Sequence, residues 1–193
     1  MKRIKIFLAS SNELLGDRLE FEREIYRKCK IWFDQEIFLH LDIWEDLSAR
    51  LSKTRSQDEY NKKIQEADLF VLLAYSKVGM YTAEEFREAY GIFKKTKKPF
   101  IFTYFKDIDK EKEDSLQDFK TELEKLEHFY ASYTDFKDFW LQFNKELDRL
   151  LLEDFETFSH SQNEKGSFNV DNPGANIGNQ FNGGTFNNPT FNN

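Results

Sequence analysis

The feature that most constrains the fold is a run of six apolar residues, Leu69–Ala74, near the middle of the chain. A run this short and unbroken by polar residues is typical of a strand that is covered on both faces at the centre of a parallel sheet. Four further apolar runs are expected strands, at residues 4–9, 37–44, 100–105 and 128–133. The segments between the runs carry apolar residues at helical spacing, and the expected helices cover residues 14–32, 56–67, 82–95, 115–126 and 135–158.

This alternation of strands and helices predicts one α/β domain, with a parallel sheet of about five strands and helices on both faces. We place this domain at residues 1–158 and treat residues 159–193 as a separate tail. In sheets of this kind, ligands bind beyond the carboxyl ends of the strands. Function is therefore expected in the loops that follow Ala9, Trp44, Ala74 and Phe105.

The charge balance and the cysteine count argue against several classes of function. The chain has 28 basic and 35 acidic residues, a net charge of −7, and an acidic chain gains nothing from counterion release on nucleic acid. One cysteine, Cys29, and three scattered histidines suggest neither a disulfide framework nor a metal site. The apolar run at the N-terminus is too short for a signal peptide or a membrane span. We therefore expect a cytoplasmic protein with no metal, no membrane contact and no nucleic-acid partner.

The segment Ser76–Ala89 follows the central apolar run and opens a helix that contains two adjacent acids. Helical spacing separates them, because Glu84 shares a solvated stripe with Glu88, whereas Glu85 shares the border of the buried face with Ala89. A carboxylate in the first turn of a helix is also favoured by the helix dipole. Glu85 is thus open to two interpretations, a helix cap or a functional carboxylate.

Three stretches of the sequence together resemble TIR domains. Ile4–Ser11 is similar to their first strand and serine turn, and Lys63–Ser76 is similar to their second helix and third strand. Tyr81–Glu85 lies where TIR domains have an aromatic residue, a small residue, two variable positions and a glutamate. The resemblance covers roughly residues 4–155 and implies a flavodoxin-like or TIR-like α/β fold.

The same region is also similar to a related family, the nucleoside deoxyribosyltransferases. Thr82, Glu85 and Ala89 match that family's pattern of threonine, two residues, glutamate and then alanine four positions later. Tyr81 stands where TIR domains usually have tryptophan, and Thr82 stands where they usually have cysteine. These departures are those of a divergent, TIR-like branch of the kind found in prokaryotic immune systems.

For an enzymatic TIR domain, the resemblance implies that Glu85 is the catalytic residue in cleavage of the glycosidic bond of NAD+. The dinucleotide is then the substrate, and no cofactor is expected. A fixed carboxylate near the sugar stabilises the positive charge that builds up on the ribose. The residues expected to bind substrate are Ser10, Ser11, Trp44, Tyr81 and Thr82.

Purely structural interpretations stay open for most of these residues. Ser10 and Ser11 fit the end of a strand and a cap of the next helix equally well. Tyr81 also fits a surface aromatic residue, and Trp44 fits a core residue. We expect the Asp17–Arg18 pair, near the start of the first helix, to be exposed.

The composition changes abruptly at Gly166, and the tail beyond it holds a single charged residue, Asp171. Three interpretations compete: a flexible end without a role, a segment whose Asn and Phe side chains stack as cross-β, or a strand that docks on a partner's sheet edge. The tail resembles C-terminal amyloid-signalling motifs of bacterial effector proteins, which implies a homo-oligomer or filament and a sensor protein with a matching motif. Phe-Asn pairs begin at Phe168, Phe181, Phe186 and Phe191, and the last three phenylalanines are the expected assembly residues.

Three hypotheses for function follow. The first is a TIR-like N-glycosidase that hydrolyses NAD+ and is activated by self-assembly, in prokaryotic immune or stress signalling. The second is a non-enzymatic adaptor that acts by association, in which Glu85 only caps a helix. The third is a nucleotide-processing enzyme similar to deoxyribosyltransferases.

Overall fold

The computed structural model describes residues 1–43 and 56–153, and its centre is a five-stranded sheet. All strand pairs are parallel, and the strand order is β2-β1-β3-β4-β5. This is the flavodoxin-like order, in which the direction of winding reverses between β1 and β3. The strands are β1 (Lys2–Ser10), β2 (Ile37–Asp42), β3 (Leu69–Ala74), β4 (Phe100–Lys106) and β5 (Ala131–Tyr133).

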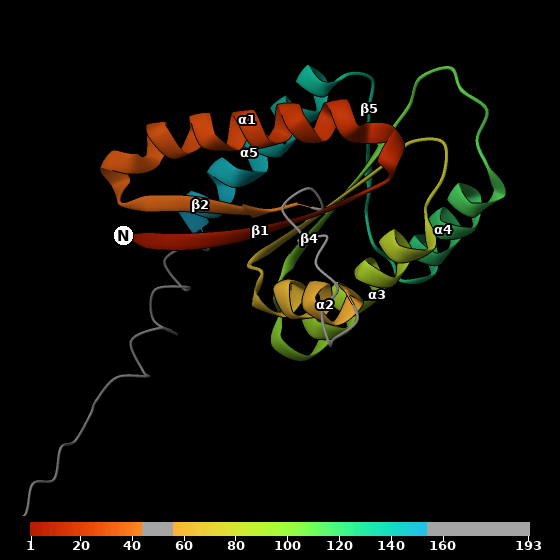
Figure 1. Cartoon of the computed structure of the whole chain (residues 1–193), viewed down its shortest axis with the longest axis horizontal. Helices are drawn as coiled ribbons and strands as arrows, with labels where there is room; N and C mark the ends of the chain where they lie inside the picture. Colours follow the sequence, from red (N-terminus) through yellow and green to blue (C-terminus); the bar gives the residue numbers. More distant parts are fainter. Residues whose placement is uncertain (44–55, 154–193) are drawn as a thin grey trace, which may run out of the picture. The chain divides into compact units, whose positions relative to one another are not determined.

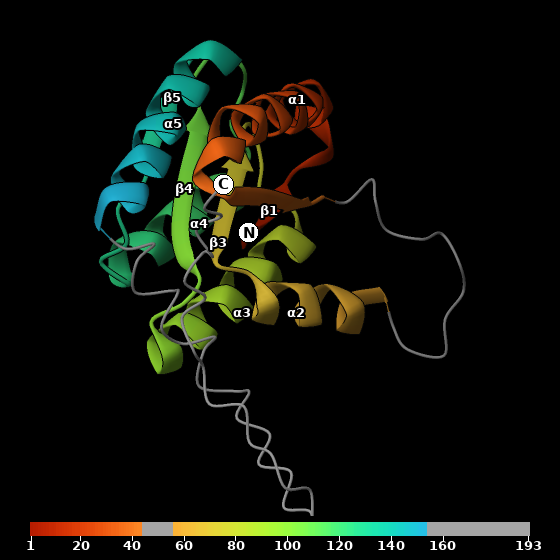
Figure 2. The same ribbon diagram turned by 90° about the vertical axis from the view of Figure 1, so that its left-hand side faces the viewer.

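Helices cover both faces of this sheet. As Figures 1 and 2 show, α1 and α5 lie on one face, and α2, α3 and α4 lie on the other. The helices are α1 (Leu15–Trp32), α2 (Ser56–Glu66), α3 (Met80–Thr96), α4 (Asp114–Lys125) and α5 (Phe136–Glu153), with short 3-10 turns at Asn12–Leu14 and Phe33–Gln35. The predicted flavodoxin-like sheet with helices on both faces is therefore confirmed.

The central strand behaves as its composition requires, because all six residues of β3 are buried. On the α2–α4 side, Phe7 stacks on Phe70, and Phe86 packs edge-on against Phe119. The other face is also largely aromatic, and its buried rings are Phe21, Tyr104, Tyr133, Phe139 and Phe143. Much of the high phenylalanine content therefore lies in the two layers between sheet and helices.

Several element ends differ from the predicted ones. The β2 strand ends at Asp42, and Trp44 lies outside the described residues, as do the boundary predicted at residue 158 and the whole tail. The fifth strand was predicted from residue 128 but begins at Ala131, because the backbone N–H groups of Glu127 and His128 bond back to α4 carbonyls. Glu127 itself has a left-handed φ of 53°, as is common just after a helix.

Candidate functional site

The carboxyl ends of β1 and β3 meet where the winding of the sheet reverses, and this is where ligands bind in such folds. The helix that leaves β3 is α3, which packs against β1, β3, β4 and α2. Thr82, Glu85 and Ala89 share one face of α3, and all three are buried. The helix therefore brings a carboxyl group to the inner side of this region.

Glu85 does not cap its helix. The N-cap of α3 is Gly79, and no acidic residue lies in the first turn. Glu85 is the sixth helical residue, and only 7% of it is exposed. The helix-cap interpretation therefore does not apply to Glu85. The neighbouring Glu84 is exposed, as its place on the solvated stripe predicted.

Burial of the Glu85 carboxyl group costs free energy, and in the described part of the chain no hydrogen bond or ion pair offsets this cost. Within residues 1–43 and 56–153, no side chain or backbone N–H forms a hydrogen bond or ion pair with it. Burial, with a smaller contribution from the nearby Glu84 charge, raises the pKa of Glu85 to about 8. A buried titratable group of this kind is common at functional sites, where it is poised for a change of charge.

Arg18 fixes the serine turn at the end of β1. Its guanidinium donates hydrogen bonds to Ser10 Oγ at 2.9 Å and to the Ser11 carbonyl oxygen at 2.8 Å. Arg18 is 4% exposed and Asp17 is also buried, so the prediction of an exposed Asp17–Arg18 pair is wrong. The two residues face inward because their partners lie on the strand ends.

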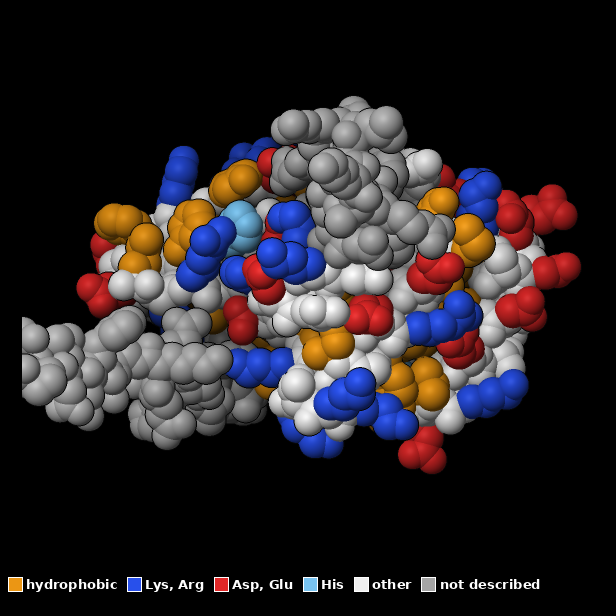
Figure 3. Space-filling view, turned by 60° about the horizontal axis from the view of Figure 1, so that its bottom comes forward, with side chains coloured by type: hydrophobic (Ala, Val, Ile, Leu, Met, Phe, Trp, Pro, Cys, Tyr) orange, Lys and Arg blue, Asp and Glu red, His pale blue; other side chains and the backbone are white. Residues whose placement is uncertain are grey.

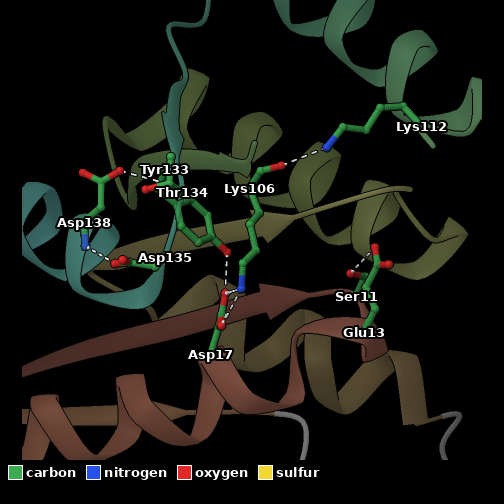
Figure 4. A network of polar contacts seen from close by, with 9 residues as sticks. All are labelled: Ser11, Glu13, Asp17, Lys106, Lys112, Tyr133, Thr134, Asp135 and Asp138. Carbon is green, nitrogen blue, oxygen red and sulfur yellow. Dashed lines mark hydrogen bonds and ion pairs between the residues drawn. The ribbon is translucent and has the colours of Figure 1, made fainter. Parts of the chain in front are cut away.

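Asp17 joins α1 to the strands β4 and β5. Lys106 Nζ lies 3.0 Å from both carboxylate oxygens of Asp17, and the Tyr133 hydroxyl donates to one of them at 2.8 Å (Figure 4). Burial and the adjacent Asp17 charge raise the pKa of Tyr133 well above its usual range. This cluster ties the first helix to the far half of the sheet, and we interpret it as part of the scaffold of the site.

Glu13 gathers three segments that follow different strands. Its carboxylate accepts hydrogen bonds from the backbone N–H and the hydroxyl of Ser76, at 2.8 and 2.7 Å, and pairs with Lys110 at 2.5 Å. The Ser11 hydroxyl donates to the same group at 3.3 Å (Figure 4). Burial alone would raise the pKa of Glu13, but the bonds from Lys110 and Ser76 lower it to about 2. Glu13 is thus a charged acceptor at neutral pH.

The other predicted substrate residues lie in different environments. Thr82 is buried one turn before Glu85, whereas Tyr81 is 58% exposed, as its surface interpretation predicted. Ser10 and Ser11 lie at the end of β1, against which α3 packs. The structure thus places the Ser10 hydroxyl against Arg18 of α1, on the sheet face opposite to the Thr82–Glu85 face of α3, and leaves Tyr81 at the surface.

Two hollows lie near these residues. One has a volume of about 790 Å³ between the loops that follow β3 and β4, and its lining includes Ser76 and Lys110. The other, of about 330 Å³, lies between α2 and α3 and is lined by Asn61, Glu84, Arg87 and Glu88. Neither is lined by Glu85. Basic and acidic side chains alternate over the face shown in Figure 3 rather than forming a patch of one sign.

Sequence reasoning missed Glu13, Ser76, Lys106, Lys110 and Tyr133. The available signal was position, since each of them lies on or just after the carboxyl end of an expected strand. Among the described residues, no group of three or more His, Cys, Asp and Glu side chains is arranged to hold a metal ion. In the same part of the chain, every helix is too short or too polar to cross a bilayer.

No protein-family model matches the sequence, and no curated protein is similar enough to count as a relative. Among solved structures, a conserved protein from Enterococcus faecalis V583 matches with a TM-score of 0.42 and 16% identity, over 75% of this chain and 99% of that one. The RPS4 and RRS1 TIR domain heterodimer matches with a TM-score of 0.44 and 12% identity, over 69% and 85% of the two chains.

A homoserine dehydrogenase from S. aureus matches with a TM-score of 0.38 and 13% identity, over 69% of this chain and 34% of that chain. At TM-scores below one half, we draw nothing about function from these similarities. The assignment of the fold rests on the order and direction of the five strands.

Proposed function

We propose that this protein is a TIR-like N-glycosidase that hydrolyses NAD+, with Glu85 as its catalytic residue. The observation that carries the proposal is a buried carboxyl group, without a partner among the described residues, on the helix that follows the central strand. The resemblance of the Ile4–Ser11 and Tyr81–Glu85 stretches to TIR domains supports the same reading. NAD+ is a substrate here, so the reaction needs no cofactor.

In the proposed reaction, the bond between ribose C1′ and the pyridinium nitrogen breaks, and its electron pair neutralises the nicotinamide. The positive charge moves to the ribose ring, as in other glycoside cleavages. An ionised Glu85 stabilises this charge across a dry environment, where a charge–charge interaction is stronger than in water. Water then attacks C1′ and loses a proton, which gives ADP-ribose and nicotinamide.

The isolated position of Glu85 favours a cationic substrate. A buried carboxylate without a basic partner is unstable as an anion, and the pyridinium of NAD+ brings the opposite charge with it. A carboxyl group that stays neutral would instead act as a general acid and donate a proton to a departing neutral base. The two roles, charge stabilisation and proton donation, therefore need opposite charge states of one residue.

The dependence of kcat/KM on pH separates these two roles of Glu85. Because the pKa of Glu85 is raised to about 8, a required carboxylate makes kcat/KM for NAD+ rise about tenfold per pH unit below pH 8 and level off above it. A required acid gives the reverse, with activity lost above pH 8. The profile should be measured on NAD+ and on a panel of nucleosides. A flat profile between pH 6 and 9 contradicts a role for Glu85 ionisation.

We also propose that activity depends on self-assembly, in prokaryotic immune or stress signalling, with a sensor protein that carries a matching tail as a possible trigger. The support lies in the sequence, since the tail repeats Phe-Asn with almost no charge, a composition prone to cross-β stacking. The assembly residues would be Phe181, Phe186 and Phe191. In the alternative adaptor function, the same association occurs without cleavage.

Removal of the tail tests the assembly proposal. A protein of residues 1–165 is expected to sediment as a monomer where the full chain forms large species, because the stacking segment is gone. Replacing Phe181, Phe186 and Phe191 together by serine in the full chain should give the same result. Analytical ultracentrifugation at equal concentrations measures both. If the shortened chain forms the same oligomers, assembly belongs to the α/β domain.

A further inference from the structure

The Glu13 carboxylate forms hydrogen bonds with several partners at once. Both of its oxygens are occupied: one accepts the Ser76 backbone N–H and the Ser11 hydroxyl, and the other accepts the Ser76 hydroxyl and Lys110. Ser76 is almost completely buried, so no water replaces these bonds easily. A buried network of this kind holds its members in one arrangement when every bond is made.

The segments that meet at Glu13 follow three different strands. Ser11 follows β1, Ser76 follows β3 and Lys110 follows β4. A second hydrogen bond holds Ser76 from another element, since the Glu113 N–H donates to the Ser76 carbonyl oxygen at 2.8 Å. Glu13 therefore fixes the β3–α3 connection, residues 75–79, from the β1 side, and the start of α4 fixes it from the other.

This connection leads directly into the helix that carries Glu85. Gly79 is the N-cap of α3, and its carbonyl oxygen accepts the first helical bond, from the Ala83 N–H, at 3.0 Å. Only three residues separate Ser76 from the first residue of the helix. A shift of Ser76 therefore has little chain in which to be absorbed before it reaches the face that holds Thr82 and Glu85.

We propose that Glu13 is a positioning residue of this site: its carboxylate anchors residues 75–79 and, through them, the first turns of α3 that present Glu85. Glu13 does not itself touch the reacting atoms, because its oxygens are taken by Ser76, Ser11 and Lys110. The predicted effect on turnover rests on the proposed NAD+ cleavage, whereas the predicted effect on the connection and on Glu85 does not.

Two variants and two controls test this role. Glu13→Ala removes all the bonds, and Glu13→Gln keeps one acceptor oxygen but brings an NH2 group to face N–H and ammonium donors. Lys110→Met removes the exposed ion pair and leaves both Ser76 bonds in place, so it separates the contribution of the ion pair from that of the Ser76 anchor. Glu20→Gln, on the exposed side of α1 just after the 3-10 turn that carries Glu13, controls for a general loss of acidic charge.

Hydrogen exchange and kinetics give separate readouts. In Glu13→Ala, exchange of the amides of residues 76–81 should speed up about tenfold or more while β3 and α5 stay protected, because the opening is local. For NAD+ cleavage, kcat should fall about tenfold while KM changes less than about threefold, since a displaced group costs turnover rather than binding. Glu13→Gln should lie between wild type and Glu13→Ala in both readouts. Glu20→Gln should match the wild type in both, and Lys110→Met should keep the exchange of residues 76–81 near the wild-type rate.

Each outcome decides the proposal. Unchanged exchange at residues 76–81 in Glu13→Ala overturns it, as does faster exchange with a wild-type kcat. A wild type that does not cleave NAD+ refutes the proposed function, and the titration of Glu85 then decides the role of Glu13. In that case Glu13→Ala must lower the pKa of Glu85, because a displaced turn admits water, and an unchanged pKa overturns the positioning role.

Discussion

Replacing Glu85 by glutamine is expected to lower the rate of NAD+ cleavage by about a hundredfold or more, the loss that follows removal of one preorganised stabilising group in a dry site. The amide has the same shape as the carboxyl group but cannot become negative. The charge that develops on the ribose therefore loses its counter-charge. Release of nicotinamide by the clustered protein at pH 8 measures the effect.

The neighbouring acid provides a matched control. Glu84 lies one residue before Glu85 on the same helix but is exposed, so Glu84→Gln removes a charge without reaching the inner face. We expect Glu84→Gln to keep cleavage within about twofold of the wild type, in line with other exposed substitutions. Equal rates in the wild type and Glu85→Gln would leave the adaptor function in place of the enzyme.

The Glu85→Gln substitution is expected to stabilise the folded protein by about 5 kcal/mol above pH 8, because Glu85 must ionise in an environment that disfavours its charge. The sign follows from proton binding. The pKa of Glu85 is about 8 in the folded chain and near its ordinary value in the unfolded chain. Between these values the folded state holds more protons, so the stability of the wild type falls as the pH rises.

Urea unfolding of the wild type and Glu85→Gln at several pH values measures this effect. The two proteins should have similar stability near pH 4, where the carboxyl group is protonated in both states. They should diverge steadily up to about pH 8 and stay apart above it. Glu84→Gln should follow the wild type closely, because the charge of Glu84 makes only the smaller contribution to the raised pKa of Glu85. A constant difference across the whole range would show that the Glu85 carboxyl group is not held in its neutral form.

Together these two results would identify Glu85 as a group kept at the expense of stability. The burial of its carboxyl group opposes folding at neutral pH, and glutamine relieves that cost while removing activity. Such a trade-off between stability and activity is common at functional sites, where a residue is needed for activity although it destabilises the fold. A residue that only filled space on α3 would show the gain in stability without the loss of cleavage.

The sequence is sufficient to predict the sheet, because local composition determines it. The six residues of β3 form an unbroken apolar run, and all are buried, so the central position of this strand follows from burial alone. Glu85 was placed at the border of the buried face by helical spacing, and that placement is confirmed. Both inferences need only neighbours within one element.

The partners of the polar residues could not be predicted in this way. Asp17 and Arg18 look like an exposed pair on a charged helix, but Lys106 and Tyr133, distant in the sequence, bind Asp17 across the ends of the strands. Glu13 likewise depends on Ser76. These contacts depend on which strand ends the sheet brings together, which hydrophobic periodicity does not encode.

The most direct test of the central claim is a titration of the Glu85 carboxyl carbon by ¹³C NMR, with and without an NAD+ analogue whose ribose ring oxygen is replaced by carbon. The proposed role of Glu85 predicts a pKa near 8 in the free protein and a lower pKa with the analogue bound, because the pyridinium cation stabilises the carboxylate. A pKa near the ordinary value of glutamate in the free protein, or one that does not respond to the analogue, would contradict it.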